Sequence, residues 1–582
     1  MNKEREKISR IEKTIICMLI ASICLVFLVK ADIIPCNSCK NCSETIHFIA
    51  VAGDTVQLAN NISDYQYMHC INLSKSNIIL DCNGYTISND TVGGFFRDGV
   101  HIYGAPSNVV IKNCMIENFY TGVYAENYAM MRNLTVKDST FRNNNHGLHI
   151  LGAVGSTFDN LQIFDTESRA IEFEDDQFAG NGGNTSTFSN IVIDNCFEGI
   201  DIFGPNGLNS GQNLIQNVTI SQCNTGISFW ETTHNTLRDV NIVKRSDDSY
   251  WSIAFPTNTY NYLDDPSSHI HDIDESNTVN GLPIMYYDSY YRECPDNEVI
   301  EHNNTYSIVG LNNCFNVTIQ NTNPSDTLGV FYTTNSTFRN MSINNTFMAV
   351  QLYYGSGNTF SDLTLWNNYD SIYTYLTTNN TFSNLNIRES DIYFYLSDYN
   401  LIENSTIDNG STGIYLYGSL FNTIRNNNIT NNEQGVALIY EEWDYMVGSN
   451  YNNITGCNIS GNNQGVYIDL DSVGSNIYNN ILANTENAYI ENDQNFWNTT
   501  KTSGTNIMGG PYLAGNFWSD YGGSDGDSDG IGDTEYEIAS DATDYDYLPL
   551  VAYTPTDTTP PTMSLEAPDN NAINTTTNTI DF

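Results

Sequence analysis

An internal repeat of 20 to 22 residues constrains the fold of this chain more than any other feature of its sequence. From Asn358 to Leu438 four similar units follow one another: NTFSDLTLWNNYDSIYTYL, NTFSNLNIRESDIYFYL, NLIENSTIDNGSTGIYLYG and NTIRNNNITNNEQGVAL. Apolar residues recur in three series, which are Phe360, Phe382, Ile402 and Ile424; Leu365, Ile387, Ile407 and Ile429; and Ile372, Ile392, Ile414 and Val436. Short alternating runs at such a period, with Asn or Gly between them, indicate a solenoid in which each unit is one turn of a parallel β-helix.

Stacking explains why such units need one another. One coil cannot bury its own apolar side chains, but coils stacked about 4.8 Å apart align the inward Ile, Leu, Val and Phe into a continuous core. A helical solenoid is the alternative for this period. Because β-branched and aromatic residues are abundant and Ala, Lys and Glu runs are lacking, strands fit better. We therefore predict an all-β parallel solenoid with coils of about 22 residues.

The repeat and its interruptions divide the chain into segments. We expect a signal peptide or anchor at 1–31, a cysteine-containing cap at 32–69, the β-helix at 70–493 with an interruption near 247–305, a C-terminal cap at 494–550, a Pro/Thr linker at 551–562 and the start of a further domain at 563–582. Because that last segment is too short to be a domain, we expect the protein to continue. Membrane contact would then come only through the N-terminal segment or through an anchor beyond Phe582.

Composition and the N-terminus indicate an exported protein. The formal charge of −46, from 22 basic and 68 acidic residues, excludes a general nucleic-acid binder because phosphate binding needs a basic surface. Five basic residues precede an apolar run from Thr14 to Val29 and a small-residue cleavage site, which predicts a secretory signal. An uncleaved anchor is the alternative. About twenty Asn-x-Ser/Thr sequons are compatible with a glycosylated extracellular surface.

Eleven of the 13 cysteines lie outside the predicted signal. Cys196 and Cys223 follow the equivalent strands IVID and VTIS on neighbouring coils, so they form either a disulfide or a stacked pair of reduced thiols. Cys36, Cys39 and Cys42 look like half of a zinc knuckle, but no partner pair follows at a suitable spacing. Local disulfides or a tether fit these three better than zinc.

Three other stretches resemble a known family. NIILDCNGYTI from Asn77, HDIDESNTVNGLPIMYY from His271 and GNFWSDYGGSDGDSDGIGDTEYEI from Gly515 together resemble the NosD-type right-handed β-helix proteins, exported repeat proteins common in archaea. The resemblance implies a right-handed helix. The founding members of the family help to mature the copper sites of nitrous oxide reductase, and the broader group includes carbohydrate-binding proteins and sugar-cleaving enzymes. The tail DTTPPTMSLEAPDNNA resembles the start of an immunoglobulin-like surface repeat.

Copper maturation and carbohydrate catalysis are two functions that these resemblances raise. Copper delivery needs clustered Met, Cys or His, whereas the nine histidines look scattered and the 12 methionines form no Met-x-x-Met array. For a polysaccharide hydrolase, lyase or epimerase, strand alternation places Glu172, Glu174, Asp201 and His149 outward in columns at separations that glycosidases use. The alternative is a solvated acidic face, and because no motif of those enzymes is present we expect this face to be non-catalytic.

A binding role has more support from the later coils. Inward Ile372, Ile392 and Ile414 force every second residue outward, which predicts two tyrosine columns on one face. The predicted ligand-binding residues are Tyr353, Tyr373, Tyr375, Tyr393, Tyr395, Tyr415, Tyr417 and Tyr467. Tyr offers an apolar ring and a hydroxyl to a sugar, although stacked Tyr also stabilises neighbouring strands without any ligand. The sequence therefore favours an extracellular structural or binding protein that contacts glycans or other surface components.

A calcium ion is the cofactor that the sequence predicts. Asp525, Asp527, Asp529 and Asp533 place oxygen ligands at positions one, three, five and nine of a loop, and Gly530 permits the turn at position six. An EF-hand would carry Glu at position twelve, where this chain has Tyr536, so the pattern fits a looser extracellular calcium loop. A flexible acidic turn is the alternative.

Overall fold

The computed structural model describes most of the chain between residues 31 and 553. The described residues are 31–63, 68–89, 97–126, 131–174, 185–204, 211–230, 232–245, 251–255, 269–301, 306–442, 445–540 and 542–553. The basic and apolar parts of the predicted signal, most of the predicted linker and the predicted domain start at 563–582 lie outside them.

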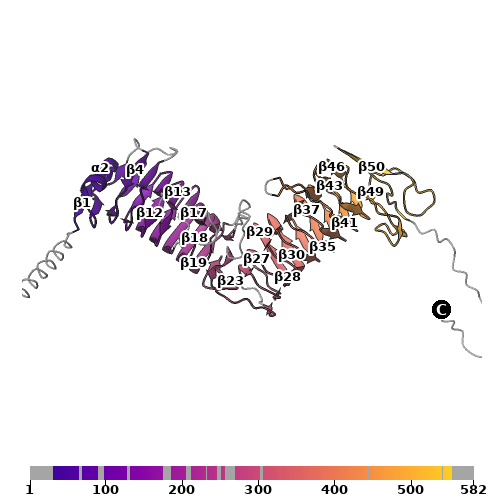
Figure 1. Ribbon diagram of the computed structural model, residues 1–582, viewed down its shortest axis with the longest axis horizontal. Coiled ribbons are helices and arrows are strands. Elements are labelled where there is room, and N and C mark those ends of the chain that lie inside the picture. Colours follow the sequence, from indigo (N-terminus) through magenta and orange to yellow (C-terminus); the bar gives the residue numbers. More distant parts are fainter. Residues whose placement is uncertain are drawn as a thin grey trace, which may run out of the picture.

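Within these residues the chain forms a parallel β-helix (Figure 1). Each coil contributes strands to three long parallel faces, which we name face A, face B and face C in chain order. The predicted all-β parallel solenoid is confirmed, because the strands of consecutive coils pair in parallel and in register.

The strands are distributed over the three faces as follows. Face A contains β1 (Ile33–Cys36), β2 (Thr55–Leu58), β5 (Ile79–Asp81), β8 (Val110–Lys112), β21 (Asp272–Ile273), β24 (Val299–Glu301), β26 (Thr318–Gln320), β32 (Thr381–Ser383), β35 (Leu401–Glu403), β38 (Thr423–Arg425), β41 (Asn453–Thr455) and β44 (Asn476–Tyr478). Face B contains β3 (Ile62–Ser63), β6 (Thr86–Ser88), β9 (Met115–Glu117), β22 (Thr278–Val279), β33 (Asn386–Arg388), β36 (Thr406–Asp408), β39 (Asn428–Thr430), β42 (Asn458–Ser460), β45 (Ile481–Ala483) and β49 (Phe517–Trp518).

Face C carries the side chains of functional interest. Its strands are β4 (His69–Leu73), β7 (Asp98–Ile102), β10 (Thr121–Ala125), β13 (His146–Leu151), β16 (Arg169–Glu174), β20 (Ile253–Ala254), β23 (Leu282–Asp288), β25 (Ile308–Asn312), β27 (Thr327–Phe331), β29 (Met348–Tyr353), β31 (Asp370–Tyr375), β34 (Asp391–Tyr395), β37 (Thr412–Tyr417), β40 (Gln434–Ile439), β43 (Gln464–Ile468) and β46 (Glu486–Ile490). Faces A and B share β12 (Thr135–Arg142), β15 (Thr157–Phe164), β19 (Thr236–Val243), β28 (Thr337–Asn344) and β30 (Thr359–Trp366), and all three faces share β17 (Thr187–Phe203) and β18 (Leu214–Trp230).

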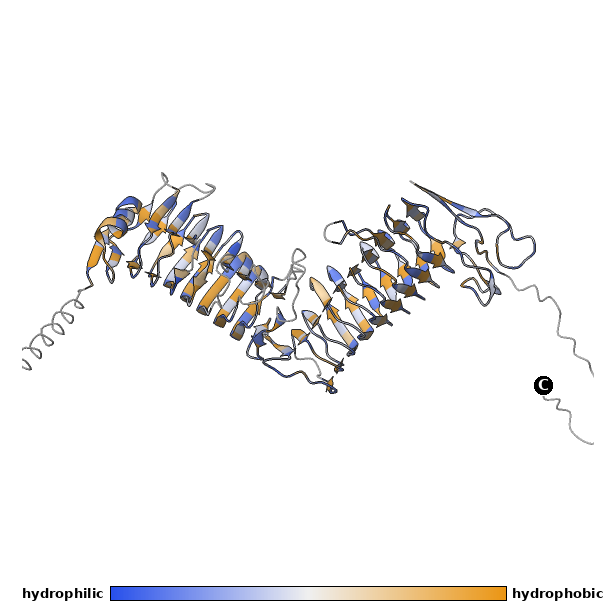
Figure 2. Ribbon diagram, in the orientation of Figure 1, coloured by the Kyte–Doolittle hydropathy of each residue, from blue (hydrophilic) through white to orange (hydrophobic). Residues whose placement is uncertain are grey.

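The apolar series of the repeat form the core in the predicted register. On face A Phe360 pairs with Phe382, on face B Leu365 pairs with Ile387, and on face C Ile392 pairs with Ile414. All of these side chains are buried. Figure 2 shows the resulting alternation of apolar and polar residues along the strands.

A ladder of buried asparagines explains why each unit of the repeat begins with Asn. The backbone N–H of Asn358 donates to Oδ1 of Asn380 at 2.9 Å, and Asn380 donates to Asn400 in the same way at 2.9 Å. The ladder continues through Asn422 to Asn452. These amides satisfy backbone groups at the turn before face A, where strand pairing is absent.

The stack consists of two arms that meet at an angle (Figure 1). We name residues 31–279 the N-terminal arm and residues 282–550 the C-terminal arm. One cluster of buried apolar residues runs along the N-terminal arm and continues past the junction to Phe331, Tyr353, Tyr375 and Tyr395, and another lies inside the coils of the C-terminal arm. The arms join where β22 and β23 pair antiparallel, and Phe255, His269 and Phe331 pack together at that junction.

Both open ends of the stack are covered. The helix α2 (Cys39–Glu44) and the π-helix η1 (Thr45–Ile49) lie at the N-terminal end. At the other end Trp497 and Trp518 are buried, and the short strands are β47 (Thr502–Ser503), β48 (Tyr512–Leu513), β50 (Tyr536–Ala539) and β51 (Thr543–Asp546). Two further strands, β11 (Met131–Arg132) and β14 (Ala153–Val154), pair with each other after face C.

Five disulfides lie within the described residues. They join Cys36 to Cys42, Cys39 to Cys70, Cys82 to Cys114, Cys196 to Cys223 and Cys294 to Cys314. Cys196 and Cys223 occupy paired positions on β17 and β18 with a Cα separation of 4.5 Å, so the disulfide, and not the pair of reduced thiols, is the alternative that the structure adopts.

Candidate functional site

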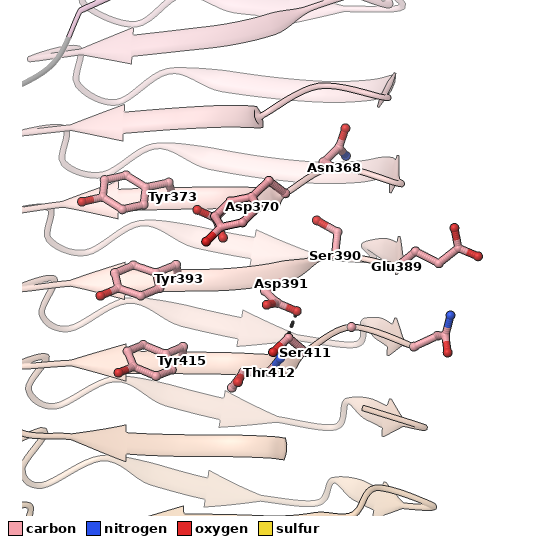
Figure 3. Close-up of a pocket in the computed structure, with 13 residues that line it drawn as sticks. Asn368, Asp370, Tyr373, Glu389, Ser390, Asp391, Tyr393, Ser411, Thr412 and Tyr415 are labelled. Atoms are coloured by element: carbon pink, nitrogen blue, oxygen red, sulfur yellow. Dashed lines mark hydrogen bonds between the residues drawn. The ribbon is translucent and has the colours of Figure 1, made fainter. Parts of the chain in front are cut away.

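Three consecutive coils of the C-terminal arm form a groove along face C. Its volume is about 610 Å³. Each coil contributes the turn before its face C strand and the first tyrosine of that strand, from β31, β34 and β37 (Figure 3). The lining residues are Asn368, Tyr369, Asp370, Tyr373, Glu389, Ser390, Asp391, Tyr393, Asn409, Gly410, Ser411, Thr412 and Tyr415. Repetition of one coil thus produces a site with a repeating lining.

Three tyrosines run along this groove as a stacked column. The ring centroids of Tyr373 and Tyr393 lie 5.3 Å apart with an interplanar angle of 8°, and those of Tyr393 and Tyr415 lie 4.8 Å apart at 11°. In Figure 3 the three hydroxyls point to the same side. Ala437 follows Tyr415 in the register, so Tyr467 belongs to the same row but lies outside the groove.

This geometry changes what the column offers to a sugar. Because the rings stack on one another, their faces are occupied and their edges and hydroxyls line the groove. The middle of the column therefore offers a sugar ring edges and hydroxyls, and not free ring faces. Burial raises the pKa of Tyr415 to about 12, so this hydroxyl stays protonated and able to donate a hydrogen bond.

The second predicted column does not form an accessible surface. Tyr353, Tyr375 and Tyr395 are 4%, 2% and 8% exposed, although they point outward in the predicted register. The residue after each strand adopts a left-handed backbone and covers the column, as Tyr354 does where its ring meets that of Tyr375 at 5.6 Å. Tyr417 is half-buried beside them and accepts a hydrogen bond from the backbone N–H of Glu442 at 3.4 Å.

Two carboxyl groups that the sequence analysis did not single out lie in the groove. Asp370 and Asp391 occupy paired positions on β31 and β34. Burial, together with the charge of Asp391, raises the pKa of Asp370 to about 7. Burial also raises the pKa of Asp391, to about 6, against the opposing effect of backbone hydrogen bonds from Thr412 and Ser411. The register between Asp370 and Ile372 contains an irregularity, which hides this pairing in the sequence spacing.

On the N-terminal arm, face C carries a row of titratable side chains. His101, Tyr124, His149, Glu172 and Asp201 pair in succession, as the sequence register predicted. Two further histidines lie beside this row. His69 lies 2.6 Å from the Asp98 carboxylate, and His146 lies 3.0 Å from the Glu172 carboxylate. Four of the nine histidines therefore lie close to this row, and the irregular coil lengths of this arm conceal their proximity in the sequence.

Glu172 and Asp201 are buried among charged neighbours, so the interpretation as a solvated acidic face is wrong for them. Arg169 contacts Glu172 at 2.6 Å, Glu198 at 2.7 Å and Asp201 at 3.0 Å. Burial alone would raise the pKa of Glu172, but His146, His149 and Arg169 together hold it at about 2. Burial and the charge of Glu198 raise the pKa of Asp201 to about 8 in spite of Arg169. Glu174 lies 3.6 Å from His149 at the outer edge of this network.

The acidic loop of the C-terminal cap brings three of the four predicted calcium ligands together. Carboxylate oxygens of Asp525, Asp527 and Asp529 lie within 4.8 Å of one another. Asp533 instead accepts a hydrogen bond from the backbone N–H of Gly526 at 2.8 Å and closes the loop. The ammonium group of Lys501 contacts Asp529, so a cation bound here would compete with it.

Family comparisons agree with this architecture. A family model described as "Right handed beta helix region" matches residues 76–204, 296–442 and 328–481, which together exceed half of the chain. The chain belongs to the right-handed β-helix family. A second model, described as "Periplasmic copper-binding protein (NosD)", matches residues 444–523 of this β-helix protein, and the predicted NosD-type resemblance is confirmed. No curated protein matches the chain.

Several solved structures are similar to the β-helix protein at low identity. A mannuronan C-5 epimerase A-module from Azotobacter vinelandii is 11% identical, with coverage of 76% of this chain and 89% of its own and a TM-score of 0.26. An alginate lyase from a Paenibacillus species is 11% identical, with coverage of 62% of this chain and 97% of its own and a TM-score of 0.21. A mannuronic acid-specific family 6 lyase from human gut microbiota is 12% identical, with coverage of 73% of this chain and 87% of its own and a TM-score of 0.22. Values this low carry no argument about activity.

No helix among the described residues is both long enough and apolar enough to cross a bilayer. The predicted N-terminal signal or anchor lies largely outside those residues.

Proposed function

We propose that this β-helix protein binds a neutral polysaccharide in the groove of Tyr373, Tyr393 and Tyr415. The observation that carries the proposal is the repetition of one lining in three consecutive coils. Coils rise by about 4.8 Å each, which is close to the length of one sugar unit in an extended polysaccharide. A sugar chain lying along the helix axis therefore meets an equivalent hydroxyl at each unit.

Charge supports a neutral ligand. The chain carries a net charge of −46, and the groove itself contains Asp370, Asp391 and Glu389. An anionic polysaccharide would be repelled both by the whole protein and within the groove. The uronic acid polymers named for the similar solved structures are consequently poorer ligands for this groove than neutral polymers.

Binding measurements on a panel of neutral polysaccharides test the proposal. Tyr393→Phe removes the central hydroxyl and keeps the ring, so we expect about tenfold weaker binding for one lost hydrogen bond. Tyr467→Phe, in the same row but outside the groove, is the matched control and leaves affinity unchanged. Equal effects of both variants, or binding of none of the polysaccharides by the parent protein, would rule the groove out.

The cellular setting belongs to the same proposal: an exported surface protein that contacts glycans. Five disulfides favour an oxidising compartment, since cytosolic thiols are kept reduced. The description of the matched NosD model as periplasmic points the same way. Cysteine alkylation with and without reductant, on protein taken directly from the native cell, tests it, because fully reactive thiols before reduction contradict export.

Calcium binding by the cap loop is part of the proposal. Asp525, Asp527 and Asp529 supply carboxylate oxygens, and Gly530 adopts the left-handed turn with φ of 86°. Calorimetry with Ca²⁺ should show millimolar or tighter binding that Asp527→Ala removes. Lys501→Met should tighten it, because the competing ammonium is lost. Heat of binding that survives Asp527→Ala would place the ion elsewhere.

Copper binding is a second candidate function, and one cluster favours it. His69, Asp98 and His101 hold donor atoms within 4.8 Å of one another beside a cavity of about 330 Å³ that Met68 also lines. Two imidazoles and a carboxylate suit Cu²⁺. Residues 444–523, which match the NosD model, contain no histidine, and their cysteine, Cys457, is buried. Cu²⁺ titration of the parent protein and of His69→Ala tests this site.

A further inference from the structure

We infer that Asp370, as the acid and then the base, and Asp391, as the nucleophile, hydrolyse a glycosidic bond of the polysaccharide in the tyrosine groove. The inference rests on the proposed glycan binding and adds a reaction to it. Both residues lie on the C-terminal arm and are separate from the network of Arg169, Glu172 and Asp201 on the N-terminal arm.

The first observation is the placement of the two carboxyl groups. They lie on neighbouring coils, in paired positions, and both line the groove next to Tyr373 and Tyr393. Neighbouring coils are about 4.8 Å apart. This is close to the roughly 5 to 5.5 Å between the carboxyl groups of glycosidases that form a covalent intermediate, whereas direct attack by water needs roughly 6.5 to 9.5 Å. A bond of a sugar chain lying along the column therefore comes within reach of both groups.

The second observation concerns Asp370, which is suited to be the acid. Its side chain is only 7% exposed, yet no residue that the structure describes donates a hydrogen bond to it. A buried carboxylate in that position is unfavourable, whereas the protonated acid is a free donor that points into the groove. The pKa of about 7 agrees with this geometry, because it keeps the proton on Asp370 near neutral pH.

The third observation concerns Asp391, which is suited to be the nucleophile. Its Oδ1 accepts the backbone N–H of Thr412 at 3.0 Å, which favours the ionised form. This approach requires glycine at 410, because a Cβ there would lie 2.3 Å from the same oxygen. Two equivalent carboxyl groups are thus placed in different environments, which is how the roles of acid and nucleophile become separated in other paired carboxylates.

The reaction balances without a metal or cofactor. The Asp370 acid donates its proton to the glycosidic oxygen as the bond from that oxygen to the anomeric carbon breaks. In the same step the Asp391 carboxylate forms a bond to the anomeric carbon. Water then forms a new bond to the anomeric carbon as the bond to Asp391 breaks, and gives a proton to the Asp370 carboxylate. The products are a new reducing end and a free hydroxyl, and the proton taken from water restores the Asp370 acid.

Other ionisable groups around the pair set the pH range. Glu389 lines the groove, the charge of Glu433 raises the pKa of Asp391, and the three tyrosines remain protonated because burial raises their pKa values. The active form has Asp391 ionised and Asp370 protonated. The hydrolysis rate should therefore peak between about pH 6 and 7.

The test measures new reducing ends from each neutral polysaccharide that the full chain binds. Asp370→Asn and Asp391→Asn should each lower the rate at least 100-fold while binding is retained. Asp362→Asn, an exposed position on β30 outside the groove, is the matched control and keeps the parental rate. The pH profile is a second readout, since Asp370→Glu should retain activity with a displaced alkaline limb.

The outcomes separate the two proposals. Binding without release of reducing ends between pH 5 and 8 overturns the inference and leaves the binding function intact. Cleavage that survives both Asn substitutions also overturns the assignment. Lack of both binding and cleavage overturns both proposals, whereas cleavage lost in both Asn variants with affinity unchanged supports the pair.

Discussion

Face C uses the same outward positions in two different ways. On the N-terminal arm they hold the titratable side chains of His101, His149, Glu172 and Asp201, and on the C-terminal arm they hold stacked tyrosines. The backbone and the apolar core are alike in both arms. The fold therefore fixes where an outward side chain lies, and residue identity decides whether the row is an ionic network or a groove lined by hydroxyls.

The largest difference between the arms should appear on reduction. Four disulfides lie in the N-terminal arm, whereas the described part of the C-terminal arm beyond Cys314 holds none. Each disulfide stabilises a domain by about 2 to 4 kcal/mol, so reduction should destabilise the N-terminal arm far more. Hydrogen exchange with and without reductant measures this for each arm, and equal loss of protection in both would contradict two independently stabilised arms.

Loss of one cation should give the next largest effect. Arg169→Met leaves the buried Glu172 and Asp201 without their shared guanidinium, which should cost about 3 kcal/mol in unfolding free energy. Arg425→Met removes an exposed pair with Glu403 on the C-terminal arm and should cost less than about 1 kcal/mol. Denaturant titrations of the two variants provide the comparison. If the two losses are similar, the network on the N-terminal arm is no stronger than a surface ion pair.

Opposite pH responses should also distinguish the arms. The pKa of Glu172 is held at about 2, below its ordinary 4.5, so its contribution to stability is present above pH 4.5 and is lost as the pH falls toward 2. The pKa of Asp370 is raised from 3.8 to about 7, so stability linked to it is present below pH 3.8 and is lost as the pH rises to 7.

Two isosteric variants measure these responses. Thermal melts from pH 3 to 8 should show Glu172→Gln less sensitive to acid than the parent, and Asp370→Asn more stable than the parent at pH 8. A melting temperature of Asp370→Asn below that of the parent at pH 8 would mean that the Asp370 carboxylate is stabilised in the folded protein, contrary to its raised pKa.

The sequence predicts register well and burial of outward residues poorly. The pairing of Phe360 with Phe382 follows from the alternation along each strand and from a constant period, and both can be read directly from the sequence. Tyr395 is buried among residues that include Glu441, in a coil longer than its neighbours, whose carboxylate lies 3.5 Å from the Tyr395 hydroxyl. That contact spans 46 positions and leaves no periodic signal.

The candidate site likewise combines rows that the sequence predicts with side-chain contacts that it does not. The tyrosine column was predicted because it repeats, whereas the Asp370–Asp391 pair was missed because a register irregularity changes their spacing from Ile372 and Ile392. On the N-terminal arm the column of His149, Glu172 and Asp201 was predicted, but His69 and His146 sit at other positions of their strands and join it only through side-chain contacts. Periodicity therefore identifies rows, and side-chain packing decides which rows become sites.

The smallest expected effect is a difference in unfolding free energy between variants at two positions of the tyrosine column. Tyr393 stacks on two neighbours at 5.3 and 4.8 Å, whereas Tyr415 stacks closely only on Tyr393, meets Tyr417 at 6.2 Å and faces Ala437 on the next coil. Each aromatic pair contributes about 0.5 to 1.5 kcal/mol beyond apolar burial, so Tyr393→Leu should lower the unfolding free energy by about twice as much as Tyr415→Leu. Chemical denaturation of both variants measures the difference. If Tyr415→Leu is as destabilising as Tyr393→Leu, contact with the underlying strands outweighs stacking. Each coil would then hold its own tyrosine, whereas on the N-terminal arm Arg169 binds Glu198 and Asp201 of the next coil.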